Sequence, residues 1–322
     1  MRIIEWNCQG AFRLKNKEIL ALKPDILIVP ECEKENKLKF GQLTPQPNDF
    51  IWYGDTDKKG IAIFSYSNYK FRLLKEFNPD FRYVVPLEVT DGKNAFLLFA
   101  IWAMDNKQNP LSRYIGQVWN AINYYETILG ENAILIGDFN SNQIWDTKDR
   151  IANHTDVVNY LRKLNIESLY HQQFCEEHGK ESLNTFFMYR NINKPYHIDY
   201  VFASQKIIKN GYKLSLEKSE NWLDKSDHVP LILDINNLDS TLKIKNTFQD
   251  IAIRNLEGLT NITKSKFKEE FLEIELLANK IDSEYANNEQ ITKYINCIDY
   301  IKQIDKLTSH LSIELSQLSN DF

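Results

Sequence analysis

The sequence predicts an α/β fold in which a system of mixed β-sheets is sandwiched by helices. Short apolar runs alternate with amphipathic segments over the first two-thirds of the 322 residues. At least one pair of runs is joined by a turn short enough for a hairpin, which argues against a single doubly wound parallel sheet. After residue 238 the strand pattern stops. We therefore predict a core domain over residues 1–238 and a helical extension over residues 239–322.

The expected strands are rich in Ile, Val, Leu, Phe and Tyr and are bounded by Gly, Pro, Asn or Asp. Arg2–Asn7 and Ala133–Asp138 are almost continuously apolar, as expected for strands covered on both faces. Tyr83–Val89 and Ala95–Ala103 flank an Asp-Gly pair and are typical of a hairpin. The remaining expected strands are Asp25–Pro30, Gly60–Tyr66, His197–Ala203, Gly211–Glu217 and Pro230–Ile235.

Helices are expected between strands where apolar residues recur every three or four positions. One covers Ile115 to Leu129, with Ser112 as its predicted N-cap. Another surrounds Val157–Leu164. The segment before it, Asn153-His154-Thr155-Asp156, has the composition of a helix cap, with a role in an active site as the alternative.

The helical extension carries two apolar stripes separated by an Asn-Asn pair, which predicts an αα-hairpin. One explanation is that the stripes pack against the core or against each other. The other is that residues 263–318 bind a partner, a membrane surface or a second copy of the chain. The stripes consist of Phe267, Phe271, Ile274, Ala278, Ile281 and Tyr285, followed by Ile291, Tyr294, Ile298, Ile301, Leu311, Leu315 and Leu318.

The composition fits a globular protein with a sizeable core, since 43% of the residues are apolar and 12% are aromatic. The formal net charge is −5, so the chain lacks the overall basic character of many nucleic-acid-binding proteins. The extension holds 10 Lys and Arg against 14 Asp and Glu, which leaves the core near neutrality with 29 against 30. Binding of a polyanion would therefore depend on a bound cation or on local basic residues.

The N-terminus and the cysteines indicate a cytoplasmic protein. The strand pattern begins at Arg2, which leaves no room for a signal peptide. No apolar run approaches the roughly 18 residues that a membrane span requires. The four cysteines form no CxxC pair, which favours free thiols in a reducing compartment over disulfides or a zinc site; they are Cys8, Cys32, Cys175 and Cys297.

Acidic and amide side chains stand at or just past the ends of predicted strands, where a sheet can bring distant residues to one rim. Glu31 follows Asp25–Pro30, Asp227 precedes the last strand, and Asn7 ends the first. Mg²⁺ prefers oxygen ligands and usually needs only one or two carboxylates from the protein. We therefore predict that Glu31 and Asp227 bind a divalent cation, with the amide oxygen of Asn7 beside them.

A second set of polar residues fits the chemistry of a phosphate ester. Asp138 and Asn140 should project together while Phe139 turns into the core, because alternate residues of an extended chain point the same way. Such a pair can orient an attacking water and hold a phosphate oxygen. Asp199 is expected to accept a hydrogen bond from one ring nitrogen of His228, leaving the imidazole to stabilise or protonate a phosphate oxygen.

Taken in order, the fragments WNCQG, PECE, GDFN, HIDYVF and SDH resemble the motifs of the endonuclease/exonuclease/phosphatase superfamily over residues 1–236. The resemblance implies a four-layer α/β/β/α sandwich of two mixed sheets and hydrolysis of a phosphoester with Mg²⁺ or Mn²⁺. It also implies a role for each residue of the site: Glu31 as main metal ligand with Asn7 and Asp227, Asp138 as activator of water, Asn140 on the phosphate, and Asp199 with His228 as a dyad.

One position departs from the family pattern, which has His or Tyr where this chain has Trp102. Indole donates one hydrogen bond but can neither accept one nor exchange a proton. Either Trp102 contacts the substrate through its N–H or ring face, or this role falls to His154, His197 or Arg113. Trp145, just after GDFN, is placed either to stack on a base or sugar or to pack in the core.

Hydrolysis of a nucleic-acid phosphodiester, by in-line attack of a metal-oriented water, is the leading prediction, and a nuclease acting on DNA or RNA is its specific form. The enzymatic alternative is a phosphatase or phosphodiesterase for a small or lipid phosphoester of the inositol phosphate, nucleotide or sphingomyelin type. A scaffold that keeps the fold without activity is disfavoured, because every expected carboxylate is present.

Overall fold

The computed structural model describes residues 1–107, 109–148, 150 and 152–236. Their strands form two six-stranded sheets and one two-stranded sheet. The predicted helical extension over residues 239–322, and with it the expected contacts through residues 263–318 and the thiol of Cys297, lies outside the described residues.

The first six-stranded sheet has the strand order β13-β14-β1-β2-β4-β3. β1 (Arg2–Glu5) and β2 (Ile26–Cys32) run parallel in its middle, and all other neighbours in this sheet are antiparallel. The sheet is therefore mixed, as predicted. Its other strands are β3 (Asp49–Thr56), β4 (Lys59–Ser65), β13 (Tyr212–Leu216) and β14 (Leu231–Ile235).

The second six-stranded sheet has the order β5-β6-β7-β8-β12-β9. β7 (Ala95–Trp102) and β8 (Ala133–Asp138) are parallel, and the other pairs in this sheet are antiparallel. The predicted hairpin is confirmed, because β6 (Val84–Thr90) pairs with β7 from Thr90 opposite Ala95. The remaining strands are β5 (Lys70–Leu73), β9 (Ile166–Ser168) and β12 (Asp199–Ser204), while β10 (Phe186–Phe187) and β11 (Pro195–Tyr196) pair separately.

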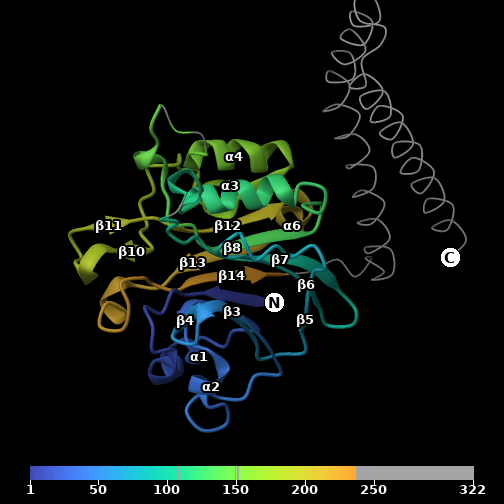
Figure 1. The fold of residues 1–322 in the computed structure, drawn as a ribbon, viewed down its shortest axis with the longest axis vertical. Helices are drawn as coiled ribbons and strands as arrows, with labels where there is room; N and C mark the ends of the chain where they lie inside the picture. The colour runs from blue at the N-terminus through green and yellow to red at the C-terminus, as the bar shows by residue number, and fades with distance from the viewer. Residues whose placement is uncertain (108, 149, 151, 237–322) are drawn as a thin grey trace, which may run out of the picture. The chain divides into compact units, whose positions relative to one another are not determined.

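Helices cover the outer faces of both sheets, which confirms the four-layer sandwich. Figure 1 shows α3 (Ile115–Tyr124) and α4 (His154–Lys163) on the side of β8 and β12, and α1 (Asn16–Ala21) and α2 (Glu35–Leu38) on the opposite side, by β3 and β4. Shorter helical segments complete this part of the chain: α5 (Leu169–Phe174), α6 (Gln205–Lys209), and the 3₁₀ turns η1 (Phe12–Leu14), η2 (Pro110–Ser112), η3 (Gln143–Trp145), η4 (Met188–Arg190) and η5 (Ser219–Asn221).

The inner faces of the two sheets meet in one apolar core. Fully buried side chains of the first sheet, such as Ile28 and Ile63, belong to the same cluster as Leu98, Ile136 and Val201 of the second. Burial of this kind is the main favourable term in folding, so the two sheets form one stable body from which loops can project. A second core, on the other face of the first sheet, contains Trp6, Phe12, Ile19, Leu38 and Phe64.

The N-cap and the end of α3 differ from the prediction, since the helix ends at Tyr124 and not at Leu129. The helix begins at Ile115 with Tyr114 as its N-cap, so the expectation that Ser112 caps it is wrong. Ser112 lies in η2, where its hydroxyl accepts hydrogen bonds of 3.0 Å from the side-chain amides of Asn109 and Asn120. By contrast, the predicted cap of α4 is confirmed: the helix begins directly after Asn153, whose backbone N–H donates to Asp156 Oδ2 at 2.8 Å.

Two further expectations concern membranes and thiols. Within the part of the chain that the structure describes, no helix is long and apolar enough to cross a membrane. Cys8, Cys32 and Cys175 are free thiols, as predicted, and the first two are buried in the core.

Candidate active site

Two buried carboxylates face each other on neighbouring strands of the second sheet. Asp138 ends β8 and Asp199 begins β12, and the antiparallel register places the two residues directly opposite. Their exposed fractions are 1% and 0%. Burial, and then the negative charge of Asp199, raise the pKa of Asp138 to about 7. Asp138 is therefore poised to exchange a proton near neutral pH.

His228 lies against both carboxylates. Its Nδ1 is 2.9 Å and 3.1 Å from the two carboxylate oxygens of Asp199, and its Nε2 is 4.0 Å from Asp138 Oδ2. Burial disfavours the charged ring, but the attraction of Asp199 and its hydrogen bond outweigh burial and raise the pKa of His228 to about 10. The ring is thus an imidazolium at neutral pH, held by Asp199 through one nitrogen.

Amide side chains fix the orientation of Asp138. Its Oδ2 accepts hydrogen bonds of 3.0 Å from Asn7 Nδ2 and from Asn140 Nδ2, and its Oδ1 accepts one of 2.8 Å from the backbone N–H of Asn140. Asn140 has a left-handed backbone, with φ of 47°, so the chain turns at this residue instead of continuing as a strand. Phe139 is fully buried, as expected, and packs on Tyr200 and Phe202.

Gly137 lets the end of β8 approach β7 closely. A Cβ at this position would lie 1.9 Å from the carbonyl oxygen of Ile101, and the φ of Gly137 is +150°. Both facts exclude an L side chain without backbone movement. The glycine before Asp138 is therefore required by the spacing of the two parallel strands that carry Trp102 and Asp138 in paired positions.

Glu31 and Asp227 lie at the rim of the first sheet. Glu31 has φ of 60° at an irregularity in the pairing of β2 with β4, and its carboxylate contacts the ammonium group of Lys59. Asp227 Oδ2 accepts a 2.8 Å hydrogen bond from Gln9 Nε2. Burial raises the pKa of Asp227; the charge of His228 acts against this rise, and the negative charge of Glu31 adds to it.

The rim offers the oxygen donors that a hard divalent cation prefers. Glu31 already holds a cation, since the ammonium group of Lys59 satisfies its charge. Asn7 Oδ1 lies at the end of the adjacent strand, where it accepts a 3.0 Å hydrogen bond from the backbone N–H of Gln9 and keeps a second lone pair. By the type of their donor atoms, Glu31, Asp227 and Asn7 therefore fit a Mg²⁺ or Mn²⁺ ion.

A second arrangement of ligand atoms occurs deeper in the site. Single ligand atoms of Asp138, Asp199 and His228 all lie within 4.8 Å of one another. His228 Nδ1 and Asp199 already satisfy each other, however, and Asp138 accepts three hydrogen bonds. This geometry fits a proton-transfer group better than a metal site.

The other predicted site residues are placed as follows. Trp102 is 4% exposed and belongs to the core between the sheets, with its ring 5.5 Å from that of Tyr83. Trp145 is 42% exposed and packs on Tyr196 at 5.2 Å. Arg113 is exposed, and its backbone carbonyl accepts a hydrogen bond from Arg150.

The remaining predicted residues, His154 and His197, are buried and lie outside the set of Asp138, Asp199 and His228. His154 Nε2 is 3.1 Å from His178 Nδ1, and His197 Nδ1 is 2.7 Å from the carbonyl oxygen of Leu183. Their exposed fractions are 1% and 2%. Neither ring is among the groups that hydrogen bond to Asp138, Asp199 or His228 in the described residues.

Sequence reasoning missed Glu5 and two positioning hydroxyls. Glu5 is 1% exposed, neither of its carboxylate oxygens has a hydrogen-bond partner among the described residues, and burial raises its pKa well above the usual range. An acidic residue inside an apolar strand directly before Trp6-Asn7 was the available signal. Thr185 Oγ1 accepts a 3.0 Å hydrogen bond from the backbone of Asp199, and Ser226 Oγ donates to the carbonyl of Asn7 at 2.7 Å. No sequence pattern marks these two contacts.

Comparisons with known proteins identify the family and the fold of the chain. A family model described as the endonuclease/exonuclease/phosphatase family matches residues 4–228. No curated protein sequence matches the chain significantly.

Solved structures share the fold. An AP endonuclease from Archaeoglobus fulgidus has a TM-score of 0.54 at 16% identity, covering 74% of this chain and 100% of that one. The AP endonuclease LMAP from Leishmania major has a TM-score of 0.54 at 12% identity, covering 73% and 87%. TDP2 from D. rerio, complexed with a single-strand DNA product, has a TM-score of 0.51 at 19% identity, covering 74% and 99%. At these identities the likeness shows the fold.

Proposed function

The chain belongs to the endonuclease/exonuclease/phosphatase family, and on that premise we propose that it is a divalent-metal-dependent phosphodiesterase that hydrolyses nucleic acid. The observation that carries the proposal is the buried set of Asp138, Asp199 and His228, which joins a carboxylate poised near neutral pH to an oriented imidazolium. Such a set can accept one proton and supply positive charge to a phosphate at the same time.

The mechanism assigns one task to each side chain. Asp138, in its ionised form, accepts a proton from the water that attacks phosphorus. His228 presents Nε2 to a non-bridging oxygen, while Asp199 holds Nδ1 and keeps the ring charged. Asn7 and Asn140 keep the Asp138 carboxylate in one orientation, so the water attacks in line with the leaving oxygen.

The metal would be held by Glu31, Asp227 and Asn7 at the rim. A bound Mg²⁺ or Mn²⁺ neutralises charge on the phosphate oxygens and on the leaving group. Lys59 must leave the Glu31 carboxylate to make room for the ion, and as an exposed side chain it is free to turn toward solvent or toward a substrate phosphate.

Exposed aromatic side chains beside the site support a nucleic-acid substrate. Phe186 of β10 forms an isolated β-bridge with His228, so the segment between β10 and β11 (residues 188–194) begins beside the site. This segment carries Tyr189, whose exposed fraction is 81%. Trp145 packs on Tyr196 of β11, the strand that follows this segment. Bases of a single strand stack on such rings without sequence preference.

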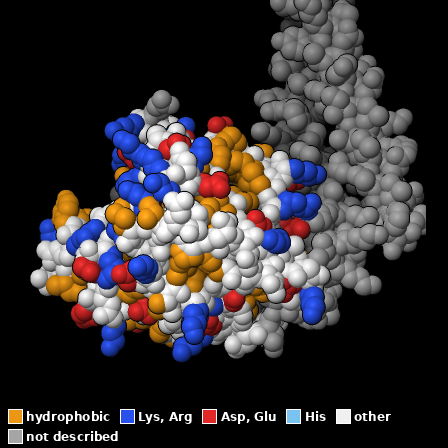
Figure 2. Space-filling view, turned by 90° about the horizontal axis from the view of Figure 1, so that it is seen from below, with side chains coloured by type: hydrophobic (Ala, Val, Ile, Leu, Met, Phe, Trp, Pro, Cys, Tyr) orange, Lys and Arg blue, Asp and Glu red, His pale blue; other side chains and the backbone are white. Residues whose placement is uncertain are grey.

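The charged side chains near the rim support a role for a metal ion in the binding of nucleic acid. Arg190, in the same segment, donates a 2.5 Å hydrogen bond to Gln9 Oε1, and the amide nitrogen of Gln9 donates to Asp227. Through Gln9, the basic side chain of Arg190 is therefore connected to the rim. On the face shown in Figure 2, basic and acidic side chains are interspersed with apolar ones, so this face is not uniformly basic. Because the formal net charge of the chain is −5, a bound cation would carry much of the attraction for phosphate.

A substrate panel tests the proposal. Plasmid DNA, single-stranded DNA, RNA, inositol phosphates and sphingomyelin are each incubated with Mg²⁺, with Mn²⁺ and with EDTA. We expect cleavage of at least one nucleic acid, dependent on metal and abolished by Glu31→Gln and by His228→Ala. Turnover of the small or lipid phosphoesters alone would assign the alternative substrate class, and nucleic-acid cleavage that survives both substitutions would remove the site.

A further inference from the structure

A cluster of histidines lies apart from the catalytic set. His228 aside, every histidine of the described residues belongs to it: His154, His171, His178 and His197. The rings of His171 and His178 are stacked with centroids 3.4 Å apart, and the rings of His154 and His178 are 5.2 Å apart. Packing of this kind brings several ring nitrogens into one small volume.

Glu181 completes a possible ligand set with two of these rings. Single ligand atoms of His171, His178 and Glu181 all lie within 4.8 Å of one another, and His171 Nε2 is 3.2 Å from Glu181 Oε1. Ligands of a tetrahedral zinc ion, with bonds of about 2.0–2.2 Å, are roughly 3.3 Å apart. The lone pair of a ring nitrogen lies in the plane of its imidazole, so the two stacked rings must turn about their side-chain bonds to bring the three groups onto one ion.

Neighbouring groups orient each of these side chains. Ser168 Oγ is 2.7 Å from His171 Nδ1, which leaves His171 Nε2 for an ion. Glu181 Oε2 accepts a 3.1 Å hydrogen bond from Asn142, and Oε1 accepts one of the same length from the backbone N–H of Gly179. His154 engages Nδ1 of His178. Metal-binding histidines and carboxylates are held by partners of this kind.

The charge states also suit a metal. Burial and the nearby ring of His171 lower the pKa of His178 to about 2, and burial lowers the pKa of His154 to about 4. Burial opposes the charge on Glu181, but hydrogen bonds from His171 and Asn142 outweigh it and lower its pKa to about 2. Neutral imidazoles with an ionised carboxylate are the forms that bind a transition metal.

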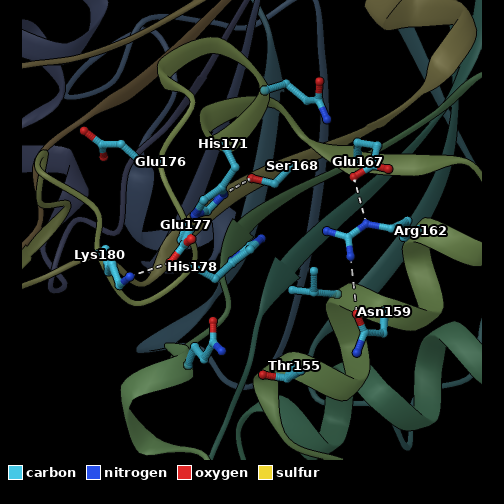
Figure 3. Close-up of a pocket in the computed structure, with 13 residues that line it drawn as sticks. Thr155, Asn159, Arg162, Glu167, Ser168, His171, Glu176, Glu177, His178 and Lys180 are labelled. Atoms are coloured by element: carbon cyan, nitrogen blue, oxygen red, sulfur yellow. Dashed lines mark hydrogen bonds and ion pairs between the residues drawn. The ribbon is translucent and has the colours of Figure 1, made fainter.

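A cavity gives access to the cluster. His171 and His178 line a cavity of about 530 Å³ between α4 and the segment that follows α5. Figure 3 shows the two rings side by side, with Lys180 and Glu177 at one edge and Arg162 with Glu167 at the other. An ion could therefore enter from solvent without opening the core.

We propose that His171, His178 and Glu181 form a second metal site that binds Zn²⁺ or a similar transition-metal ion. Imidazole ligands favour such ions over Mg²⁺, which prefers the oxygen-rich rim. The ion joins α5 to the segment that leads through Leu183 to Thr185. Because Thr185 Oγ1 accepts the backbone N–H of Asp199, the metal stabilises the chain next to the catalytic dyad.

Titration of the full chain with Co²⁺, a spectroscopic substitute for Zn²⁺, tests the site. With the rim saturated by excess Mg²⁺, we expect one equivalent of Co²⁺ to give the visible absorption of a low-coordinate ion, displaced by Zn²⁺. Glu181→Gln and His171→Gln should each weaken binding at least 100-fold, and Ser168→Ala, which keeps every ligand, should weaken it about 10- to 100-fold. Glu177→Gln, an exposed carboxylate on the same segment, should leave binding unchanged.

The catalytic variant Glu31→Gln separates this site from the rim, because it should retain full Co²⁺ absorption. Absence of the absorption in the wild-type chain would overturn the proposal. The proposal would also be overturned if Glu31→Gln abolished the absorption, or if the absorption persisted unchanged in Glu181→Gln and Ser168→Ala. Far-UV circular dichroism of each variant shows whether it is folded, and Ser168→Ala keeps the test decisive if a ligand variant unfolds.

Discussion

At the scale of single residues, the activity depends on the ionised form of Asp138. Replacing Asp138 by Asn keeps an oxygen for the amide donors of Asn7 and Asn140 but removes the base. We expect kcat to fall by about 10²–10⁴-fold with little change in KM. Steady-state kinetics measure this fall, with Asp234→Asn as control, since Asp234 pairs with Arg2 away from the site. Equal losses in both variants would contradict the assignment.

The pH dependence follows from two perturbed groups. The pKa of Asp138 is raised to about 7, so the fraction able to accept a proton grows as the pH rises through 7. The pKa of His228 is raised to about 10, so its positive charge is kept at neutral pH and is lost as the pH rises through about 10. We expect kcat/KM to rise toward neutrality, to stay level, and to fall again near pH 10. A rate already maximal well below pH 7 would show that Asp138 is not the base.

At the scale of elements, the close approach of β7 and β8 depends on Gly137. Gly137→Ala places a Cβ 1.9 Å from Ile101 O at a φ of +150°, so the strands must separate. We expect a loss of about 3 kcal/mol in the free energy of unfolding, measured by urea denaturation. Gly92, at φ +85° in the β6–β7 turn, has room for a methyl group, with no other atom within 4 Å of the Cβ position, and Gly92→Ala should cost about 1 kcal/mol. Similar losses in the free energy of unfolding at the two positions would show that the strands can avoid the contact with Ile101 at little cost.

The segment between β10 and β11 should bind substrate through its exposed ring. Tyr189→Ala removes a stacking surface beside the site, so we expect the affinity for a single strand to fall by about 1–3 kcal/mol. Fluorescence anisotropy in a His228→Ala background measures binding without cleavage. Ile192→Ala, a change of exposed apolar surface on the same segment, is the matched control and should have little effect. An unchanged affinity in Tyr189→Ala would exclude the ring from the binding surface.

At the scale of the whole molecule, metal binding should stabilise the fold through the rim. Mg²⁺ at 100 times its dissociation constant contributes about 2.7 kcal/mol to a site present only in the folded state. We expect a rise in Tm of roughly 5–10 °C in calorimetry, reversed by EDTA and absent in Glu31→Gln. The same rise in that variant would place the ion elsewhere.

Most of the fold was predictable because its central strands are covered on both faces. β2, β8 and β12 each contain an apolar run of at least four residues, so composition alone marks them. β3 was missed because its residues are half-buried or exposed and include Gly54, and β10 and β11 because two residues carry no periodicity. Ser112 was misassigned because its hydroxyl is engaged by side-chain amides instead of by the helix end.

The sequence predicted which residues form the site better than it predicted how those residues are arranged. The expected hydrogen bond between Asp199 and His228 is present, and Asn140 lies beside Asp138. The pairing of Asp138 with Asp199 depends on the register of two strands joined by some 60 residues of chain, which no local pattern encodes. The grouping of His171 with His178 depends in the same way on the path of the chain after α5.

The register of β8 and β12 also limits how the chain can vary. Side chains alternate between the faces of a strand, so a shift of β12 by a single position would carry Asp199 to the opposite face and leave the imidazole without its counter-charge. Any length change between the two strands must therefore be absorbed in the connecting loops. Chimeras that exchange those loops can preserve catalysis only if they keep the register in which β8 pairs with β12.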